Sequence, residues 1–295
     1  MPLSSASIEG TYTALVTPFA KGKVDFTRFK ANIEAQVRAG VTGIVPVGTT
    51  GESPTLSHDE HCKVIEVAVK AARGRVQVVA GTGSNCTAEA VDYTRHARKA
   101  GADAALMVNP YYNKPTQEGL YRHFMTVADA VDLPIILYNI PGRTGITMSP
   151  ATVARLYKHD NIIAIKEATG SLDMASEIAS VCDIPMLSGD DSLTLPLIAV
   201  GAKGVISVAS NIVPDRVVAL ASTALMGDFA SALAIHKALF PLMKNLFIET
   251  NPVPVKHAMK LMGLDTGEVR LPLCEMTADS QAALKKILKA QGLVK

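Results

Sequence analysis

The sequence alternates short apolar segments with segments of helical character, eight times in succession. The apolar segments are residues 10–17, 43–47, 76–80, 104–108, 134–138, 162–166, 185–188 and 204–208. They are mostly hydrophobic throughout and do not alternate with polar residues, which is typical of parallel strands covered on both faces. Because eight strand–helix units close a (β/α)8 TIM barrel, we predict this α/β fold.

A doubly wound open sheet is the alternative for such a pattern. It usually has fewer units, and no G-x-G-x-x-G follows the first predicted strand. The last part of the chain has helical patterns and no predicted strand, and it is interrupted by four prolines: Pro241, Pro252, Pro254 and Pro272. We therefore predict a catalytic barrel over residues 1–227 and a C-terminal helical domain over residues 228–295.

Local signals place helices between the strands. Ser57 and Glu60 fit a capping box, Ser149 precedes a proline at a helix start, and Gly40 and Gly101 fit helix ends. The predicted helices are residues 25–39, 57–72, 87–100, 117–130, 193–200 and 214–226, with two more that begin at residues 149 and 171.

The composition argues against nucleic-acid and membrane partners. The 295-residue chain has a net charge of +2 and no long basic run. No apolar run approaches the ~18 residues of a membrane span, and residues 1–5 lack the basic and apolar regions of a signal peptide. The cysteines are scattered and indicate free thiols in a reducing compartment: Cys62, Cys86, Cys182 and Cys274. We expect a soluble, cytoplasmic protein.

One predicted strand ends in a lysine. Residues 162–165 are three isoleucines and an alanine, and Lys166 follows them directly. Burial removes an ammonium group from water and favours the neutral amine, which forms Schiff bases with carbonyl compounds. The alternative is a lysine whose amine reaches solvent or pairs with Glu167. Lys166 is therefore a candidate nucleophile.

Other polar and aromatic residues follow the predicted strands, at the end where TIM barrels carry their active sites. They lie at residues 48–52, 109–112, 138–143 and 188–191. Each has an ordinary alternative, such as a plain turn, tyrosine packing or a solvated arginine. Together, a lysine nucleophile, phenols for proton transfer, and hydroxyls and an arginine for carboxylates indicate a Schiff-base aldolase for a 2-oxo acid.

Metal binding fits the pattern less well. Asp190 and Asp191 have no histidine or third carboxylate at ligand spacing, so we interpret them as helix-capping residues. His58 and His61 are three residues apart near a helix start, without the cysteine or carboxylate support of a zinc site. No metal is expected.

Three motifs resemble the signatures of the dihydrodipicolinate synthase (4-hydroxy-tetrahydrodipicolinate synthase) family, in the pyruvate-dependent class I aldolase/lyase superfamily. They are GTTGE at residues 48–52, YNIPGR at residues 138–143 and IKE at residues 165–167. The similarity covers nearly the whole chain and includes NPVPVK at residues 251–256. Gly142 and Arg143 narrow the match to the synthase within the superfamily.

The resemblance implies the catalytic residues. Lys166 would form the Schiff base with pyruvate, and Tyr138 would orient the intermediate and pass protons. Thr49 and Tyr112 would complete a relay of hydroxyl groups, which can move a proton without any group remaining charged for long. Tyr112 is expected in the same active site, and Tyr111 is expected to reach that of a neighbouring subunit.

The resemblance also implies the substrates and the assembly. The family condenses pyruvate with L-aspartate 4-semialdehyde in lysine (diaminopimelate) biosynthesis, as a homotetramer of tight dimers without metal or organic cofactor. Thr50, Gly189 and Ile206 would hold pyruvate, and Arg143 would bind the carboxylate of the aldehyde, for which a guanidinium offers a bidentate grip.

A regulatory site for free L-lysine is implied as well, in a cleft at the tight dimer interface. Carboxylate and imidazole groups can accept hydrogen bonds from its ammonium groups, and an amide can hold its carboxylate. The alternative is a capping box with surface histidines. The residues at matching positions are Ser53, Leu56, His58, His61, Asn85, Glu89 and Tyr111.

Two other functions are compatible with parts of the pattern. N-acetylneuraminate lyase and 2-oxo sugar acid aldolases share the lysine, the tyrosine and the glycine-rich turn. Their polyhydroxylated substrates have less use for an arginine at position 143. A non-catalytic barrel that only binds an oxo acid is the remote alternative, because a fold alone does not prove activity.

Overall fold

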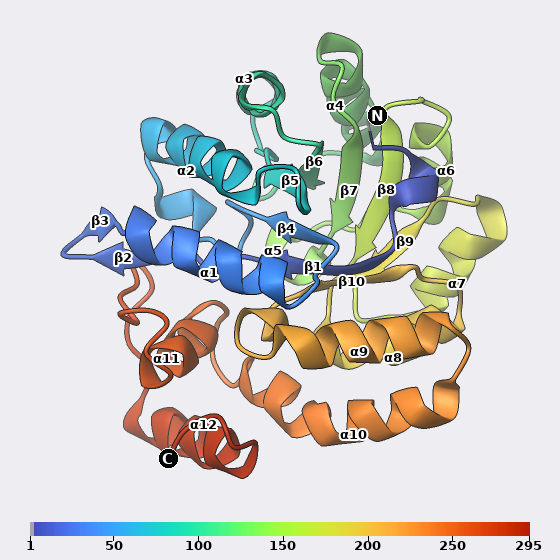
Figure 1. Ribbon diagram of the computed structural model, residues 1–295. Coiled ribbons are helices and arrows are strands. Elements are labelled where there is room, and N and C mark those ends of the chain that lie inside the picture. Colours follow the sequence, from blue (N-terminus) through green and yellow to red (C-terminus); the bar gives the residue numbers. More distant parts are fainter. Residues whose placement is uncertain (1–2) are drawn as a thin grey trace.

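The computed structural model describes residues 3–295, in which a parallel sheet closes into a barrel (Figure 1). The strand order is β1-β10-β9-β8-β7-β6-β5-β4, and parallel pairing of β1 with β4 completes the circle. The predicted TIM barrel is therefore confirmed. The strands are β1 (Gly10–Ala14), β4 (Gly43–Val45), β5 (Gln77–Gly81), β6 (Ala104–Val108), β7 (Ile135–Asn139), β8 (Ile162–Glu167), β9 (Met186–Ser188) and β10 (Gly204–Ser207).

Helices follow the barrel strands and cover the outside of the sheet (Figure 1). The predicted Ser57–Glu60 capping box is present, Ser149 accepts a hydrogen bond from the Thr152 amide, and Gly101 ends its helix with φ +91°. The helices are α1 (Phe26–Arg38), α2 (His58–Ala72), α3 (Thr87–Ala100), α4 (Gln117–Ala130), α5 (Pro141–Thr144), α6 (Pro150–Leu156), α7 (Leu172–Val181), α8 (Thr194–Ala199) and α9 (Pro214–Leu225), with the short turns η1 (Ser5–Ser7), η2 (Ser53–Thr55), η3 (Asp191–Leu193) and η4 (Ala209–Asn211).

Two strands end at least two residues before their apolar segments do. The first ends at Ala14, and the chain then forms a small antiparallel pair, β2 (Phe19–Ala20) and β3 (Lys23–Val24), that the sequence did not predict. The second ends at Val45, because Val47 has φ +51° and starts a turn. Both strands therefore end early, on the side of the barrel where the polar residues gather.

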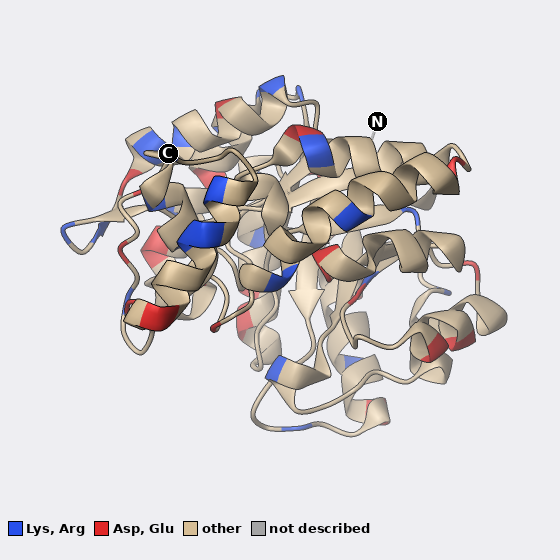
Figure 2. Cartoon of the chain, turned by 90° about the horizontal axis from the view of Figure 1, so that it is seen from below, with Lys and Arg blue, Asp and Glu red and all other residues tan. Residues whose placement is uncertain are grey.

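Charged residues are interspersed along the helices and loops. In the view of Figure 2, lysine and arginine residues are interspersed with aspartate and glutamate residues. No helix within residues 3–295 combines the length and apolar character that a membrane span requires.

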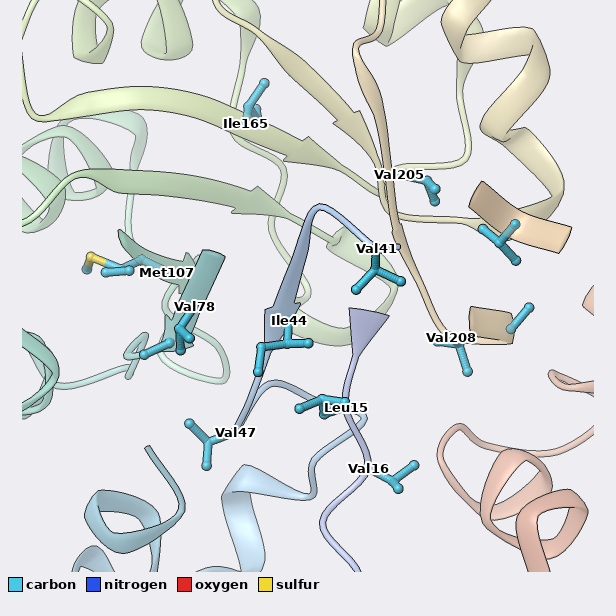
Figure 3. Close-up of a cluster of buried hydrophobic side chains, with 14 of the residues drawn as sticks. Leu15, Val16, Val41, Ile44, Val47, Val78, Met107, Ile165, Val205 and Val208 are labelled. Carbon is cyan, nitrogen blue, oxygen red and sulfur yellow. The ribbon is translucent and has the colours of Figure 1, made fainter. Parts of the chain in front are cut away.

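The core has two layers. The outer layer lies between the sheet and the helices, and Figure 3 shows part of it, including Ile44, Met107, Ile165 and Val205. The inner layer fills the barrel and contains Tyr138 together with Tyr12, Val79, Leu106, Ile136, Leu187 and Ile206. Because side chains alternate across a strand, Ile165 belongs to the outer layer and its successor Lys166 faces the interior.

Three helices follow the barrel: α10 (Phe229–Asn245), α11 (Val253–Leu261) and α12 (Ala278–Ala290). Residues 228–295 contain no strand. Helix α10 packs against α8 and α9 of the barrel, and α12 packs against α10 and α11 (Figure 1). A domain boundary between residues 227 and 228 stays a prediction.

Candidate active site

Lys166 and Tyr138 lie side by side at the carboxyl ends of β8 and β7. The register pairs the two residues across the strands, and Lys166 Nζ lies 4.2 Å from the centroid of the Tyr138 ring. The two side chains are 6% and 5% exposed. The structure thus places an amine and a phenol together in a site with little access for water.

Glu167 does not form an ion pair with Lys166. Its carboxylate accepts hydrogen bonds from the Thr169 backbone amide at 2.6 Å and from Asn139 Nδ2 at 3.5 Å. Burial raises the pKa of Glu167. The alternative in which Lys166 pairs with Glu167 is therefore not what the structure shows.

The turn between β4 and α2 carries Thr49 and Thr50. The Gly51 amide donates to Gly48 O and the Glu52 amide donates to Thr49 O, each at 3.1 Å. Thr49 lines a small cavity together with Tyr138, which brings two of the predicted relay residues to one space. Thr50 is buried, and its Oγ1 accepts a hydrogen bond from Asn251 Nδ2 at 3.0 Å.

Arg143 lies in α5, a single turn that sequence analysis did not predict. Its guanidinium is exposed and donates from Nη2 to Asn251 O at 3.1 Å. Arg143 and Thr49 both line a larger cavity of about 360 Å³. The predicted site for the aldehyde carboxylate therefore adjoins the threonine turn.

Gly189 directly follows β9, and Ile206 lies in β10, which β1 separates from the strand before the threonine turn. The Gly189 amide donates to Glu167 O at 2.7 Å, and a side chain at position 189 would collide with Ala168. Ile206 is fully buried in the inner layer that also contains Tyr138. Both residues belong to the strand ends around the barrel interior.

The structure separates the two adjacent tyrosines. Tyr112 has φ +72° and a side chain that is 90% exposed, so one chain alone does not bring it to Tyr138. Tyr111 instead lines the larger cavity. Burial raises the pKa of the Tyr111 phenol, and the charge of Glu89 raises it further.

Most of the predicted regulatory residues line the same larger cavity: Ser53, Leu56, His61, Glu89 and Tyr111. Asn85 adjoins it, because its Nδ2 donates to Tyr111 O at 3.1 Å. Exposed His58 lies outside the lining and stacks on Tyr93, with 5.0 Å between ring centroids. These regulatory candidates therefore share a cavity with Thr49 and Arg143, whereas Lys166 and Tyr138 lie outside its lining.

His61 is held neutral in this cavity. Burial lowers its pKa to about 4, and its Nε2 donates to Gly81 O at 2.9 Å. The ring also stacks on Tyr93 at a centroid distance of 4.1 Å. Its other ring nitrogen is thereby left as an acceptor.

Sequence reasoning missed several residues of the site. Tyr93 lines the larger cavity, and its spacing of four residues from Glu89 on one helix was an available signal. Asn251 was noted only within a motif, yet it contacts both Thr50 and Arg143. No local pattern indicated that residues around position 251 would lie against a turn near position 50.

One of the two aspartates after β9 binds backbone amides. Asp191 is buried, and its carboxylate accepts hydrogen bonds from Ser207 Oγ at 2.5 Å and from the Val208 and Ala209 amides at 3.0 Å. The capping interpretation fits Asp191, although the capped turn is η4. It is wrong for Asp190, whose side chain makes no cap hydrogen bond to η3. Within residues 3–295, no three His, Cys, Asp or Glu side chains are grouped as a metal site requires.

The fold and the site define the class of protein. A closed (β/α)8 barrel places a buried lysine beside a tyrosine at the carboxyl ends of its strands, as in the TIM-barrel enzymes of the Schiff-base aldolase type. The chain belongs to the dihydrodipicolinate synthetase family, whose sequence profile matches residues 7–291.

Curated relatives agree with this membership. The chain is 56% identical to the 4-hydroxy-tetrahydrodipicolinate synthase of Endomicrobium trichonymphae, with 97% of this chain and 99% of that protein covered. It is 54% identical to the enzyme of the same name from Methanocaldococcus jannaschii, again with 97% and 99% covered.

Solved structures are similar over the same length. The dihydrodipicolinate synthase of Aquifex aeolicus matches with a TM-score of 0.96 and 52% identity, over 97% of this chain and 99% of that one. The enzyme of Acinetobacter baumannii, solved with pyruvate, matches at 0.95 and 43%, over 97% and 100%. The enzyme of Cyanidioschyzon merolae, solved with lysine bound, matches at 0.95 and 40%, over 98% and 99%.

Proposed function

We propose that this protein is a 4-hydroxy-tetrahydrodipicolinate synthase, a lyase of lysine biosynthesis that condenses pyruvate with L-aspartate 4-semialdehyde. The observation that carries the proposal is the buried Lys166 amine 4.2 Å from the Tyr138 ring, next to the cavity that Thr49 and Tyr138 share. The four free thiols of the protein agree with a role in the cytoplasm.

The reaction begins at the lysine. The Lys166 amine attacks the ketone carbon of pyruvate, and loss of water gives a Schiff base. Removal of a proton from the methyl group forms an enamine, whose carbon attacks the aldehyde of the second substrate. We assign the proton transfers of these steps to Tyr138 and Thr49, and their shared position in the lining of the small cavity supports this assignment.

The two substrates bring separate carboxylates, which need separate sites. The Thr50 hydroxyl and the backbone of its turn suit pyruvate, together with Ile206 in β10 and Gly189 after β9. Exposed Arg143 suits the carboxylate of the semialdehyde, because a guanidinium can hold a carboxylate with two hydrogen bonds. The Arg143 guanidinium favours the synthase over N-acetylneuraminate lyase and the 2-oxo sugar acid aldolases.

We assign the relay role of Tyr112 to an assembled form of the protein, a homotetramer built as a dimer of dimers. The Tyr112 side chain is 90% exposed in one chain, so a neighbouring chain is needed to bring it to a relay. We infer that the same assembly closes the cavity lined by Tyr111 and Glu89. We infer that this cavity binds free L-lysine, as an inhibitor of the reaction.

Trapping of the Schiff base tests the proposal. Incubation with pyruvate and borohydride should add one reduced pyruvate per chain, on the peptide that carries Lys166, as read by intact and peptide mass spectrometry. The variant Lys166→Arg is the control and should remain unlabelled, because a guanidinium does not form the adduct. Labelling at another lysine, or none at all, would contradict the proposal.

A coupled assay then separates the synthase from its relatives. The protein should turn over pyruvate with L-aspartate 4-semialdehyde and leave N-acetylneuraminate uncleaved. Cleavage of the sugar acid without activity on the semialdehyde would favour the lyase instead.

A further inference from the structure

A buried ion pair joins the C-terminal segment to the threonine turn. Lys256 Nζ of α11 lies 2.6 Å from Glu52 Oε1, and both side chains are 0% exposed. The same amine donates to Thr17 O at 2.9 Å and lies 4.2 Å from the centroid of the Phe19 ring. The lysine thus spans the end of β1 and the turn that follows β4.

Glu52 is held in the turn by its backbone and is held to the C-terminal segment by both carboxylate oxygens. Its amide donates to Thr49 O at 3.1 Å, and its φ of +53° gives the chain the bend that ends the turn. The second carboxylate oxygen, Oε2, accepts a hydrogen bond from the Arg270 amide at 3.1 Å. Any displacement of this carboxylate therefore moves the backbone next to Thr50.

Asn251 makes a second connection from the same segment. Its Nδ2 donates to Thr50 Oγ1 at 3.0 Å, and its backbone oxygen accepts from Arg143 Nη2 at 3.1 Å. Because the Thr50 oxygen accepts this hydrogen bond, its own hydrogen is left to be donated to a carboxylate. Asn251 is buried, so water does not compete strongly for these contacts.

We propose that Lys256 and Asn251 are positioning residues, which hold the Thr49–Thr50 turn in the geometry that binds the carboxylate of pyruvate. This inference rests on the proposed function. A buried ion pair is often no more stabilising than an apolar pair of the same volume, so stability alone does not account for Lys256 and Glu52. What the pair supplies is a fixed distance between α11 and the turn.

The test measures the pyruvate concentration that gives half-maximal borohydride trapping on Lys166. Lys256→Met combined with Glu52→Gln removes both charges and leaves neither one buried alone. Asn251→Ala removes the contact to Thr50 and leaves the ion pair. In each case we expect the half-saturating pyruvate concentration to rise about tenfold, as for a weakened hydrogen bond to a charged group. Trapping at saturating pyruvate should remain near the wild-type extent.

Glu52→Asp is the sharper variant, because it keeps the paired charge and shortens the side chain by one methylene. It should also raise the half-saturating pyruvate concentration if the position of the turn matters. The control is Tyr12→Phe, which removes a hydrogen bond of 2.6 Å to Gln77 inside the same barrel but away from the turn. It should lower the melting temperature and leave pyruvate saturation unchanged.

The outcomes separate the two proposals. If Glu52→Asp and Asn251→Ala both keep the wild-type half-saturating pyruvate concentration, the positioning role is overturned, whether or not their melting temperatures change. If the double variant at positions 52 and 256 does not fold, these two variants decide the question. Absence of an adduct in the wild-type protein instead contradicts the proposed function itself.

Discussion

The inward orientation of the Lys166 side chain follows from its two neighbours in β8. Ile165 packs in the outer layer of the core, and Glu167 is buried with hydrogen bonds from Thr169 and Asn139. With both neighbours fixed outside the barrel, the period of two in a strand directs the lysine inward. The amine then meets Tyr138, which the register places in the same row of the sheet.

A substitution at Arg143 should affect the binding of one substrate and not the other. Arg143→Ala should raise the KM for the semialdehyde by roughly tenfold to a hundredfold, since a hydrogen bond to a charged group contributes about 1.5–3 kcal/mol. The KM for pyruvate should change much less. Arg143→Lys is the matched control and should show a smaller loss, because it keeps the charge without the planar fork. An unchanged KM for the semialdehyde in Arg143→Ala would contradict the assigned role.

The connections between strands and helices depend on a few buried side chains. Asp191, at the start of η3, holds the amides of Val208 and Ala209 and the hydroxyl of Ser207. It therefore ties the loop after β9 to the loop after β10. Burial raises the pKa of this carboxyl, and the hydrogen bonds it accepts act in the opposite direction.

Asp191→Ala should destabilise the protein through this connection. The substitution leaves buried amide donors without an acceptor, which costs roughly 2–3 kcal/mol of the free energy of unfolding. Urea unfolding followed by circular dichroism measures the change. Asp173→Ala, at an exposed aspartate of α7, is the control and should stay within about 0.5 kcal/mol of wild type. Equal stability of the two variants would show that the Asp191 contacts contribute little.

On the scale of the whole molecule, one cavity links distant parts of the chain. Its lining comes from the turn after β4, from α3, from the loop after β6 and from α5. Arg143 and Thr49 lie in the same lining as Glu89 and Tyr111. A ligand that orders Tyr111 would therefore also affect the adjacent Tyr112.

A lysine titration of the initial rate tests this link. L-lysine at millimolar concentration should inhibit partially and without competing with pyruvate, because it binds beside the catalytic residues and not on Lys166. Glu89→Ala should abolish the inhibition by removing a carboxylate for the ligand's ammonium group. Glu275→Ala, at an exposed glutamate elsewhere, should retain it.

Two results would speak against the regulatory site. An unaffected wild-type rate would show that the cavity does not regulate this protein. Full inhibition of Glu89→Ala would place the effect of lysine elsewhere.

The sequence by itself determined the repeating strand–helix architecture and the position of Lys166 at a strand end. These features rest on local physics: apolar segments, capping residues such as Ser57, and alternation along a strand act within a few residues. The same local signals predicted the polar residues at the carboxyl ends of the strands, because every TIM barrel gathers those ends on one face.

The tertiary structure decided which of those residues meet. The Lys256–Glu52 and Asn251–Thr50 contacts join residues 204 and 201 positions apart in the chain. Closure of the barrel and packing of α11 create these contacts, and no periodic pattern encodes them. The same reason explains why Tyr111 lines the cavity and Tyr112 does not, since the backbone at Tyr112 turns with φ +72°.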